Sequence, residues 1–133
     1  MISESKVWMF SNNSENKTLD ESTKGKWLVK GSLKYFEKTF PKIDYLVEQG
    51  KIYAAKYTHK KNINEEMLPF NKPEMCVYAD DKTKEKTLEE LLNLGIKKAE
   101  WKYNSETRKD WQPGGKLYKE SERQRLEYFL MKY

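Results

Sequence analysis

Short strand-like segments and longer helix-like segments alternate along this sequence, and their order limits the folds that the chain can adopt. The strand-like segments are rich in aromatic and β-branched side chains and are bounded by glycine, proline or polar clusters; they cover residues 6–10, 25–31, 51–60, 73–81, 97–104 and 114–121. The helix-like segments cover residues 32–49, 87–95 and 122–133. We therefore predict a single α+β domain over residues 1–133, in which an antiparallel sheet of about six strands has two or three helices packed on one face.

Capping residues mark the ends of the two main predicted helices. Ser32 can accept hydrogen bonds from first-turn amides, apolar residues follow at helical spacing, and Gly50 is a natural stop. Pro41 predicts a bend or a division within this helix. In the second helix Thr87 is the predicted cap and Gly95 the predicted stop.

The charge of the sequence favours anionic partners. There are 26 Lys and Arg residues against 21 Asp and Glu, which gives a net charge of +5. Aromatic residues make up 14% of the chain, a fraction that argues against disorder. A folded domain with a basic exterior suits phosphorylated small molecules, RNA or acidic proteins as partners.

Other features of the sequence narrow the compartment and the chemistry. Cys76 is the only cysteine and His59 the only histidine, so the chain can form neither an internal disulfide nor a Cys/His zinc site. No apolar stretch approaches the roughly 18 residues of a membrane span, and the first residues lack the pattern of a signal peptide. We expect a cytoplasmic protein with no cofactor, no structural metal and no membrane partner.

Several segments resemble the basophilic-leukaemia-expressed protein family. They are GKWLV at 25–29, GKIYAAKYT at 50–58, EMCVYADD at 74–81, LGI at 94–96, and KYNSETRKDW at 102–111 followed by LY at 117–118. The fold of this family is similar to that of translation initiation factor 4E, so the resemblance implies a concave sheet face that accepts a phosphate-bearing ligand. Some family members carry a phosphothreonine-lyase label. The tryptophan sandwich that factor 4E uses for a methylated guanine is not implied, because the loop at 11–25 contains no tryptophan.

Basic and aromatic residues on strands and in the stretch 102–118 are the candidate ligand-binding residues. Arginine offers a planar fork to phosphate oxygens, lysine offers a point charge, and an aromatic ring can stack a base. We interpret 102–118 as two strands joined by a loop that carries Arg108 and Trp111 and forms one wall of the site. Neighbours in an extended segment point to opposite sides, so we expect Arg108→Ala to weaken binding more than Lys109→Ala. The predicted ligand-binding residues are Lys56, Tyr57, Lys102, Tyr103, Arg108, Trp111, Lys116 and Tyr118.

The other aromatic and acidic candidates favour structural roles. Trp27 and Trp101 lie at the centres of predicted strands, which indicates core positions, whereas Trp8 suits either the core or a ligand platform. Asp80 and Asp81 could bind a metal or serve as an acid and a base. Their position after a strand favours a role at the start of a turn.

Three functions stay open. The first is a binding module for a nucleotide or another phosphorylated small molecule, which suits a bacterial or phage protein that sequesters a nucleotide signal. The second is a metal-independent phosphate lyase in which Lys56 removes a proton, His59 assists the leaving phosphate and Arg108 binds it. The sequence indicates that His59 lies at an exposed strand end, and in this hypothesis it acts from that position. The third is a single-stranded RNA-binding module, for which basic residues interleaved with aromatic ones are suitable.

Overall fold

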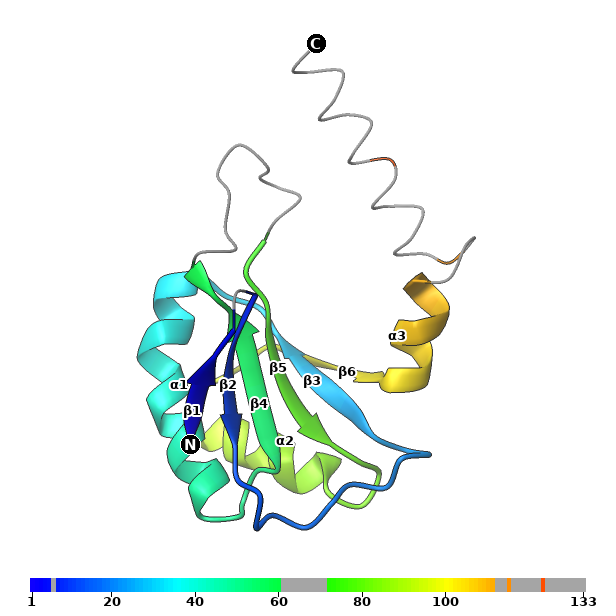
Figure 1. The fold of residues 1–133 in the computed structure, drawn as a ribbon, viewed down its shortest axis with the longest axis horizontal. Coiled ribbons are helices and arrows are strands. Elements are labelled where there is room, and N and C mark those ends of the chain that lie inside the picture. Colours follow the sequence, from blue (N-terminus) through cyan, green and yellow to red (C-terminus); the bar gives the residue numbers. More distant parts are fainter. Residues whose placement is uncertain (6, 61–71, 112–114, 116–122, 124–133) are drawn as a thin grey trace.

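The computed structural model describes residues 1–5, 7–60, 72–111, 115 and 123, and these form one six-stranded sheet with three helices (Figure 1). The strands are β1 (Ile2–Glu4), β2 (Trp8–Asn12), β3 (Gly25–Val29), β4 (Ala54–Thr58), β5 (Met75–Ala79) and β6 (Ala99–Tyr103). The helices are α1 (Leu33–Glu48), α2 (Lys84–Asn93) and α3 (Asn104–Trp111). The predicted α+β class with an antiparallel sheet is confirmed. Apart from single residues, the strand predicted at 114–121 and the helix predicted at 122–133 lie outside the described residues.

The strands lie in the order β1-β2-β4-β5-β3-β6, and each neighbouring pair is antiparallel. The sequence analysis missed β1, which is only three residues long and exposed throughout. Strand β1 therefore pairs with β2 through backbone hydrogen bonds, and its sequence shows no alternation of apolar and polar residues that would indicate a strand. The result is a sheet whose central strands are β4, β5 and β3.

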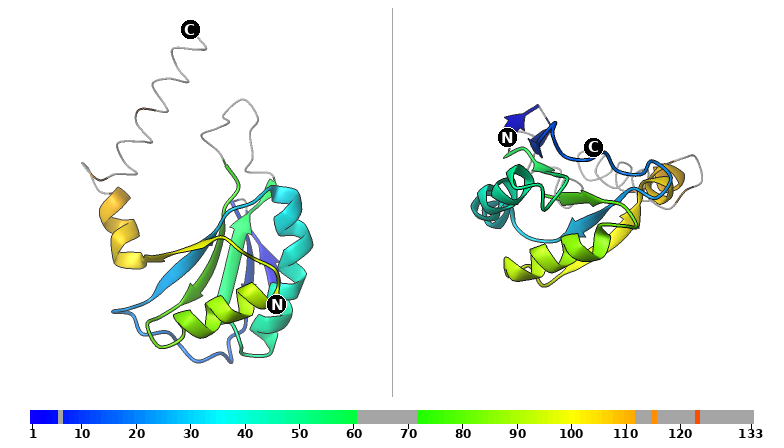
Figure 2. Two further views of the ribbon diagram at one scale, coloured as in Figure 1. Left: turned by 180° about the vertical axis from the view of Figure 1, so that it is seen from behind. Right: turned by 90° about the horizontal axis from the view of Figure 1, so that it is seen from below.

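Helices α1 and α2 cover the same face of the sheet, as the view from below in Figure 2 shows. Helix α1 packs against β2 and β4, and helix α2 packs against β5 and β3. Helix α3 lies at the β6 edge instead and contacts β3 and β6. The other face of the sheet carries neither α1 nor α2.

The core lies between α1, α2 and the sheet. Phe36, Phe40, Ile43 and Val47 recur at helical spacing on α1 and are at most 1% exposed. Ser32 caps the helix as predicted, since its hydroxyl accepts a hydrogen bond from the N–H of Tyr35 at 3.1 Å. Burial of this apolar stripe is the main term that holds α1 to the sheet.

Of the two effects predicted for Pro41, a bend or a division of the first helix, the division does not occur. Helix α1 runs without interruption from Leu33 to Glu48 and contains Pro41. Pro41 is exposed, so its ring lies on the side of the helix away from the core. The buried stripe on the opposite side continues past the proline, and packing therefore outweighs the lost backbone hydrogen bond.

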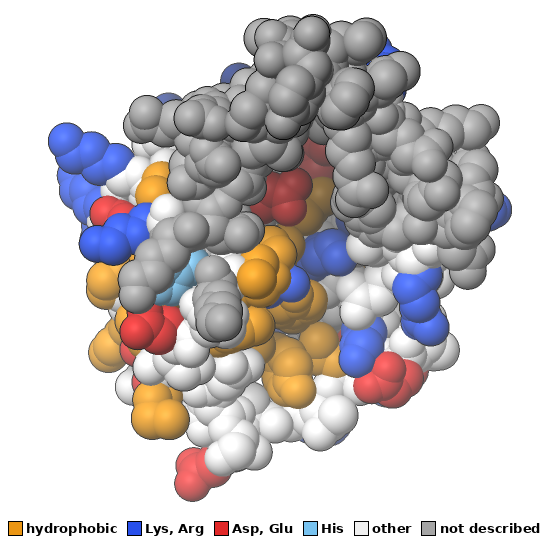
Figure 3. Space-filling model, turned by 45° about the horizontal axis from the view of Figure 1, so that its top comes forward, with side chains coloured by type: hydrophobic (Ala, Val, Ile, Leu, Met, Phe, Trp, Pro, Cys, Tyr) orange, Lys and Arg blue, Asp and Glu red, His pale blue; other side chains and the backbone are white. Residues whose placement is uncertain are grey.

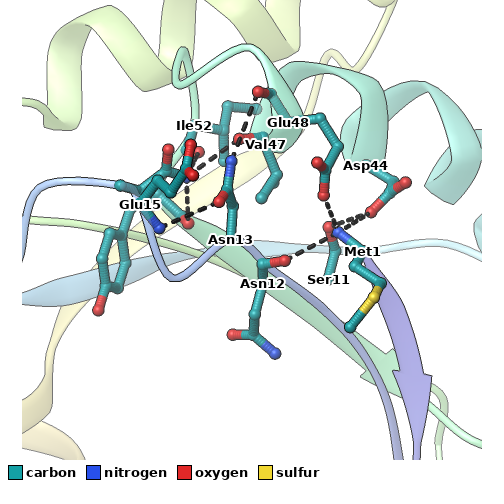
Figure 4. A network of polar contacts seen from close by, with 11 residues as sticks. Met1, Ser11, Asn12, Asn13, Glu15, Asp44, Val47, Glu48 and Ile52 are labelled. Carbon is teal, nitrogen blue, oxygen red and sulfur yellow. Dashed lines mark hydrogen bonds and ion pairs between the residues drawn. The ribbon is translucent and has the colours of Figure 1, made fainter.

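Polar contacts hold the first two strands against α1 (Figure 4). The Ser11 hydroxyl donates to Asp44 at 2.7 Å across the strand–helix interface. The amino group of Met1 donates to the carbonyl of Asn12 at 2.8 Å and forms ion pairs with Asp44, at 3.0 Å, and with Glu48. These contacts fix the position of β2, which carries two aromatic residues of the site described below.

Two further helix boundaries differ from the sequence-based expectation. Helix α2 begins at Lys84 with Thr83 as its N-cap, so Thr87 lies inside the helix and is buried. Gly95, with a φ of 89°, follows the helix as expected. Among the described residues, no helix is both long enough and apolar enough to cross a bilayer.

Helix α3 replaces the loop that we predicted between residues 104 and 111. Its charges suit a helix, because Glu106 lies in the first turn and Arg108 and Lys109 lie in the last turn. A negative charge near the N-terminus and positive charges near the C-terminus both interact favourably with the helix dipole, so this order of charges could have indicated the helix. The argument that Arg108 and Lys109 point to opposite sides of an extended segment therefore does not apply.

Candidate functional site

The sheet face opposite α1 and α2 concentrates lysine and aromatic side chains. Strand alternation and the registers place on it Trp8 and Phe10 from β2, Lys56 from β4, Tyr78 from β5, Lys26 from β3, and Lys102 and Glu100 from β6. We call this surface the basic face. Figure 3 looks onto it and shows Lys and Arg side chains, together with an acidic one, beside hydrophobic side chains in a hollow near its middle.

Lys26 lies at the centre of the basic face. It stands directly opposite Tyr78 on β5 and directly opposite Lys102 on β6, so two like charges meet across neighbouring strands. Burial lowers the pKa of Lys26 below its usual value; Cys76 and Glu74 act against this shift, and the charges of Lys56 and Lys102 act with it. Within the described part of the chain, no carboxylate forms an ion pair with Lys26.

Lys56 lies between two aromatic rings. Its Nζ is 3.9 Å from the centroid of the Trp8 ring and 5.9 Å from the centroid of the Tyr78 ring. A cation over a ring face is attracted by the negative charge of the π system. Each of these three side chains is half-buried. The Lys56 ammonium therefore lies against aromatic rings. It forms no ion pair with a described carboxylate.

A hollow of about 400 Å³ adjoins Lys26 at the α3 edge of the basic face. Arg108 and Thr107 reach it from α3, and Lys24 reaches it from the segment before β3. Lys24 is paired with Glu21 at 2.9 Å, so its charge is partly balanced. The residues that line the hollow are Glu21, Lys24, Lys26, Tyr78, Asn104, Thr107 and Arg108.

Close packing fixes the position of β6 beside this hollow. A Cβ atom on Gly25 would lie 2.5 Å from the carbonyl oxygen of Lys102, so only glycine allows β3 and β6 to approach this closely. The Trp27 and Trp101 rings meet edge to face at 5.3 Å beneath the same two strands. Trp27 packs against the core and its Nε1 donates to the carbonyl of Lys84 at 2.8 Å, so it occupies a core position as predicted.

The predicted site residues do not all lie on one face. Lys56 and Lys102 lie on the basic face, and Arg108 lines the adjoining hollow. Tyr57 lies on the helix-covered face, is 8% exposed and packs with its ring 4.6 Å from that of Phe40. Adjacent strand residues point to opposite faces, so Lys56 and Tyr57 cannot both contact a ligand on the basic face.

Tyr103 also lies on the helix-covered face. Its hydroxyl donates to Asp81 at 2.6 Å and accepts a hydrogen bond from Lys84 at 3.1 Å. It thus links β6 to the start of α2 and faces away from Lys102. The side chain of Trp111 and the predicted site residues Lys116 and Tyr118 lie outside the described residues.

The expectation that His59 is an exposed strand end is wrong. His59 is 4% exposed, and its Nε2 lies 2.8 Å from Oε2 of Glu4. It lines a hollow of about 490 Å³ with Met9 and Tyr57, which belong to the helix-covered face. Lys56 and His59 therefore lie on opposite sides of the sheet, and the structure does not bring together the lysine, histidine and arginine of the predicted lyase.

Asp80 begins a turn, as its position after a strand predicted. Its Oδ1 accepts hydrogen bonds from the N–H groups of Lys82 and Thr83 and from the Thr83 hydroxyl, and its Oδ2 accepts one from the N–H of Asp20. Burial alone would raise the pKa of this carboxyl, but these hydrogen bonds lower it. Within the described residues, no group of three or more His, Cys, Asp or Glu side chains could hold a metal ion.

Sequence reasoning missed Lys26 and Tyr78, and it left Trp8 open between the core and a ligand platform. The signal for Lys26 was present in GKWLV, because a strand that turns Trp27 and Val29 toward the core must turn Lys26 and Leu28 the other way. The same alternation in MCVYA places Tyr78 on the face opposite Val77. The cross-strand neighbours depend on the strand order and could not be read from one strand alone.

Comparison with protein-family models, with curated proteins and with solved structures finds no match for the chain. The resemblance to the basophilic-leukaemia-expressed protein family therefore stays a prediction. The residues of the basic face and their geometry are the basis of the functional argument.

Proposed function

We propose that this protein binds a nucleotide or another phosphorylated small molecule on the basic face. The observation that carries the proposal is the meeting of Lys26, Lys56 and Lys102 on one half-buried sheet surface. Half-buried like charges repel each other and lose hydration, and within the described residues no carboxylate forms an ion pair with Lys26 or Lys56, so a bound anion would offset part of this cost. A phosphate group brings negative charge to this surface and accepts hydrogen bonds from several ammonium groups.

The aromatic side chains of the basic face favour a ligand that also carries a flat ring. Trp8 and Tyr78 are half-buried, so each still presents part of its ring to a ligand. Stacking of a base on an aromatic side chain tolerates any base and adds to the charge interaction. A nucleotide combines both groups in one small molecule.

The proposal includes a fold similar to that of translation initiation factor 4E, with its ligand on the sheet face that the main helices leave uncovered. The order of layers here is compatible with that arrangement. The mode of base recognition would differ, because no tryptophan occurs in the loop at 11–25. A cytoplasmic domain of this kind in a bacterium or a phage could sequester a nucleotide signal.

Binding without turnover is the function that the geometry supports best. A lyase would need Lys56 and His59 at the same substrate, and they lie on opposite faces of the sheet. Burial raises the pKa of the Cys76 thiol, which lies on the basic face, to about 11, so this cysteine is protonated at neutral pH and is a poor nucleophile. We therefore expect ADP incubated with the protein to be recovered unchanged by chromatography after denaturation.

The proposal is tested by titrating ADP into the protein at low salt and measuring the heat of binding. Arg108 lines the hollow beside Lys26, whereas Lys109, its neighbour on α3, does not, so the two form a matched pair. Arg108→Ala should weaken ADP binding about tenfold or more, because a charge-assisted hydrogen bond contributes roughly 1.5 to 3 kcal/mol. Lys109→Ala should change the affinity less than about threefold, since it alters only a screened, exposed charge. Equal effects of both variants, or no saturable binding of ADP to the parent protein, would contradict the proposal.

A further inference from the structure

Lys56 is flanked by aromatic rings on two sides. In the register of the sheet it pairs with Phe10 on β2 and with Cys76 on β5. Trp8 lies two residues from Phe10 toward one end of β4, and Tyr78 lies two residues from Cys76 toward the other end. The two rings therefore lie on opposite diagonals of the same lysine.

The distances make this a compact arrangement. Because Lys56 Nζ is 3.9 Å from one ring centroid and 5.9 Å from the other, the two centroids lie within about 10 Å of each other, the sum of both distances. One positive charge thus stands between two flat apolar surfaces. A ligand that matches this pattern has one negative charge between two flat groups.

A mononucleotide does not match the whole pattern, because it has one base and would leave one of the rings without a partner. Two nucleosides joined through phosphate place the negative charge between two bases, and successive bases commonly stack on separate aromatic side chains. Lys26 stands beside Tyr78 and can bind a further, terminal phosphate.

We infer that the basic face binds a free dinucleotide, with one base on Trp8, the other on Tyr78 and the linking phosphate on Lys56. The inference rests on the proposed function, because it assigns positions within the same site. On binding, the Lys56 ammonium moves from the Trp8 ring to the phosphate, and a base takes its place on that ring. The attraction between the Lys56 ammonium and the Trp8 ring is thereby replaced by a charge-assisted hydrogen bond to the phosphate and by stacking of a base on that ring.

The test compares ADP with the dinucleotide pApA, which carries the same kind of base and a similar charge but has a second ring. We expect pApA to bind the parent protein about tenfold or more tightly than ADP, since each stacked base contributes that much. This comparison uses the unaltered chain and needs no variant to fold. Affinities within about threefold of each other would overturn the inference and leave the proposed function standing; saturable binding of neither compound would overturn both.

Variants of Trp8 and Tyr78 test whether these two rings stack the bases. Trp8→Leu and Tyr78→Leu should each lower the affinity for pApA about tenfold, whereas the control Tyr45→Leu, an exposed tyrosine on α1, should not change it. Tighter binding of pApA that neither variant weakens, in proteins shown to be folded by circular dichroism, would overturn the assignment. A ten-residue adenylate strand should bind no more tightly per site than pApA. A strand that binds much more tightly would overturn the free dinucleotide in favour of single-stranded RNA.

Discussion

Replacing Lys26 with methionine should make the protein more stable and lower its affinity for phosphorylated ligands. Methionine keeps much of the length of the lysine side chain and removes its charge. Lys26 directly faces Lys102 across β3 and β6 and is half-buried. Burial is the main cause of the lowered pKa of Lys26, so we expect Lys26→Met to raise the free energy of unfolding by about 1 kcal/mol, chiefly because the half-buried ammonium loses hydration.

The pH dependence of this gain has a definite sign. Burial and the neighbouring lysines lower the pKa of Lys26 in the folded protein, so between that pKa and the unfolded value of about 10.4 the unfolded chain binds more protons. The penalty from Lys26 is fully present below its folded pKa and disappears as the pH rises toward the unfolded value. The stability difference between Lys26→Met and the parent should therefore be largest near neutral pH and shrink in alkaline solution.

Urea unfolding followed by circular dichroism at several pH values measures this difference. The control is Lys38→Met, an exposed lysine on α1 that forms no ion pair with a described carboxylate. We expect it to change stability by less than about 0.5 kcal/mol. A Lys26→Met protein that is less stable than the parent, or a difference that grows with pH, would refute the account of Lys26 as a half-buried cation that lowers stability.

Two further predictions concern the structure that supports the site. Asp80→Asn should cost about 1 to 3 kcal/mol, because the amide has one carbonyl oxygen for the N–H groups of Lys82 and Thr83 and places its NH2 donor against the N–H of Asp20, from which Oδ2 now accepts. The lowered pKa of Asp80 means that its contribution is present above the unfolded value of about 3.9 and is lost as the pH falls through the folded pKa, so acid unfolding curves of the two proteins should converge; curves that diverge would contradict this. Phe40→Ala should cost about 3 to 5 kcal/mol in urea unfolding, since Phe40 is 1% exposed and packs on Tyr57, and a cost below about 1 kcal/mol would mean that Tyr57 is free to leave the core.

Much of the fold could be predicted because local signals agree with the packing. Ser32 before an apolar stripe, and Gly50 after it, mark α1 to within one or two residues of its observed ends. The alternation of each strand predicts which side chains share a face. Pro41 does not divide the helix, because the stripe of buried side chains continues on both sides of it.

The candidate site could be predicted only in part, because it depends on which strands are neighbours. Lys26, on β3, and Lys102, on β6, come together since β3 lies between β5 and β6, an order that no local pattern encodes. Tyr57 is a different case, since its alternation with Lys56 already excluded it from the basic face. His59 was misjudged because flanking lysines suggest exposure, whereas its contact with Glu4 depends on the short strand β1.

The central claim, that the ligand lies on the basic face, is tested most directly by two adjacent alanines on β4. Ala54 faces the basic side beside Tyr78, whereas Ala55 faces the core beside Val77. In protein labelled at its alanine methyl groups, titration with ADP should shift the Ala54 resonance in a saturable manner, because ring currents and charge of a bound nucleotide act at close range. The Ala55 resonance should shift far less. Saturable shifts of Ala55 alone, or equal shifts of both methyl groups, would contradict a ligand on this face of the sheet.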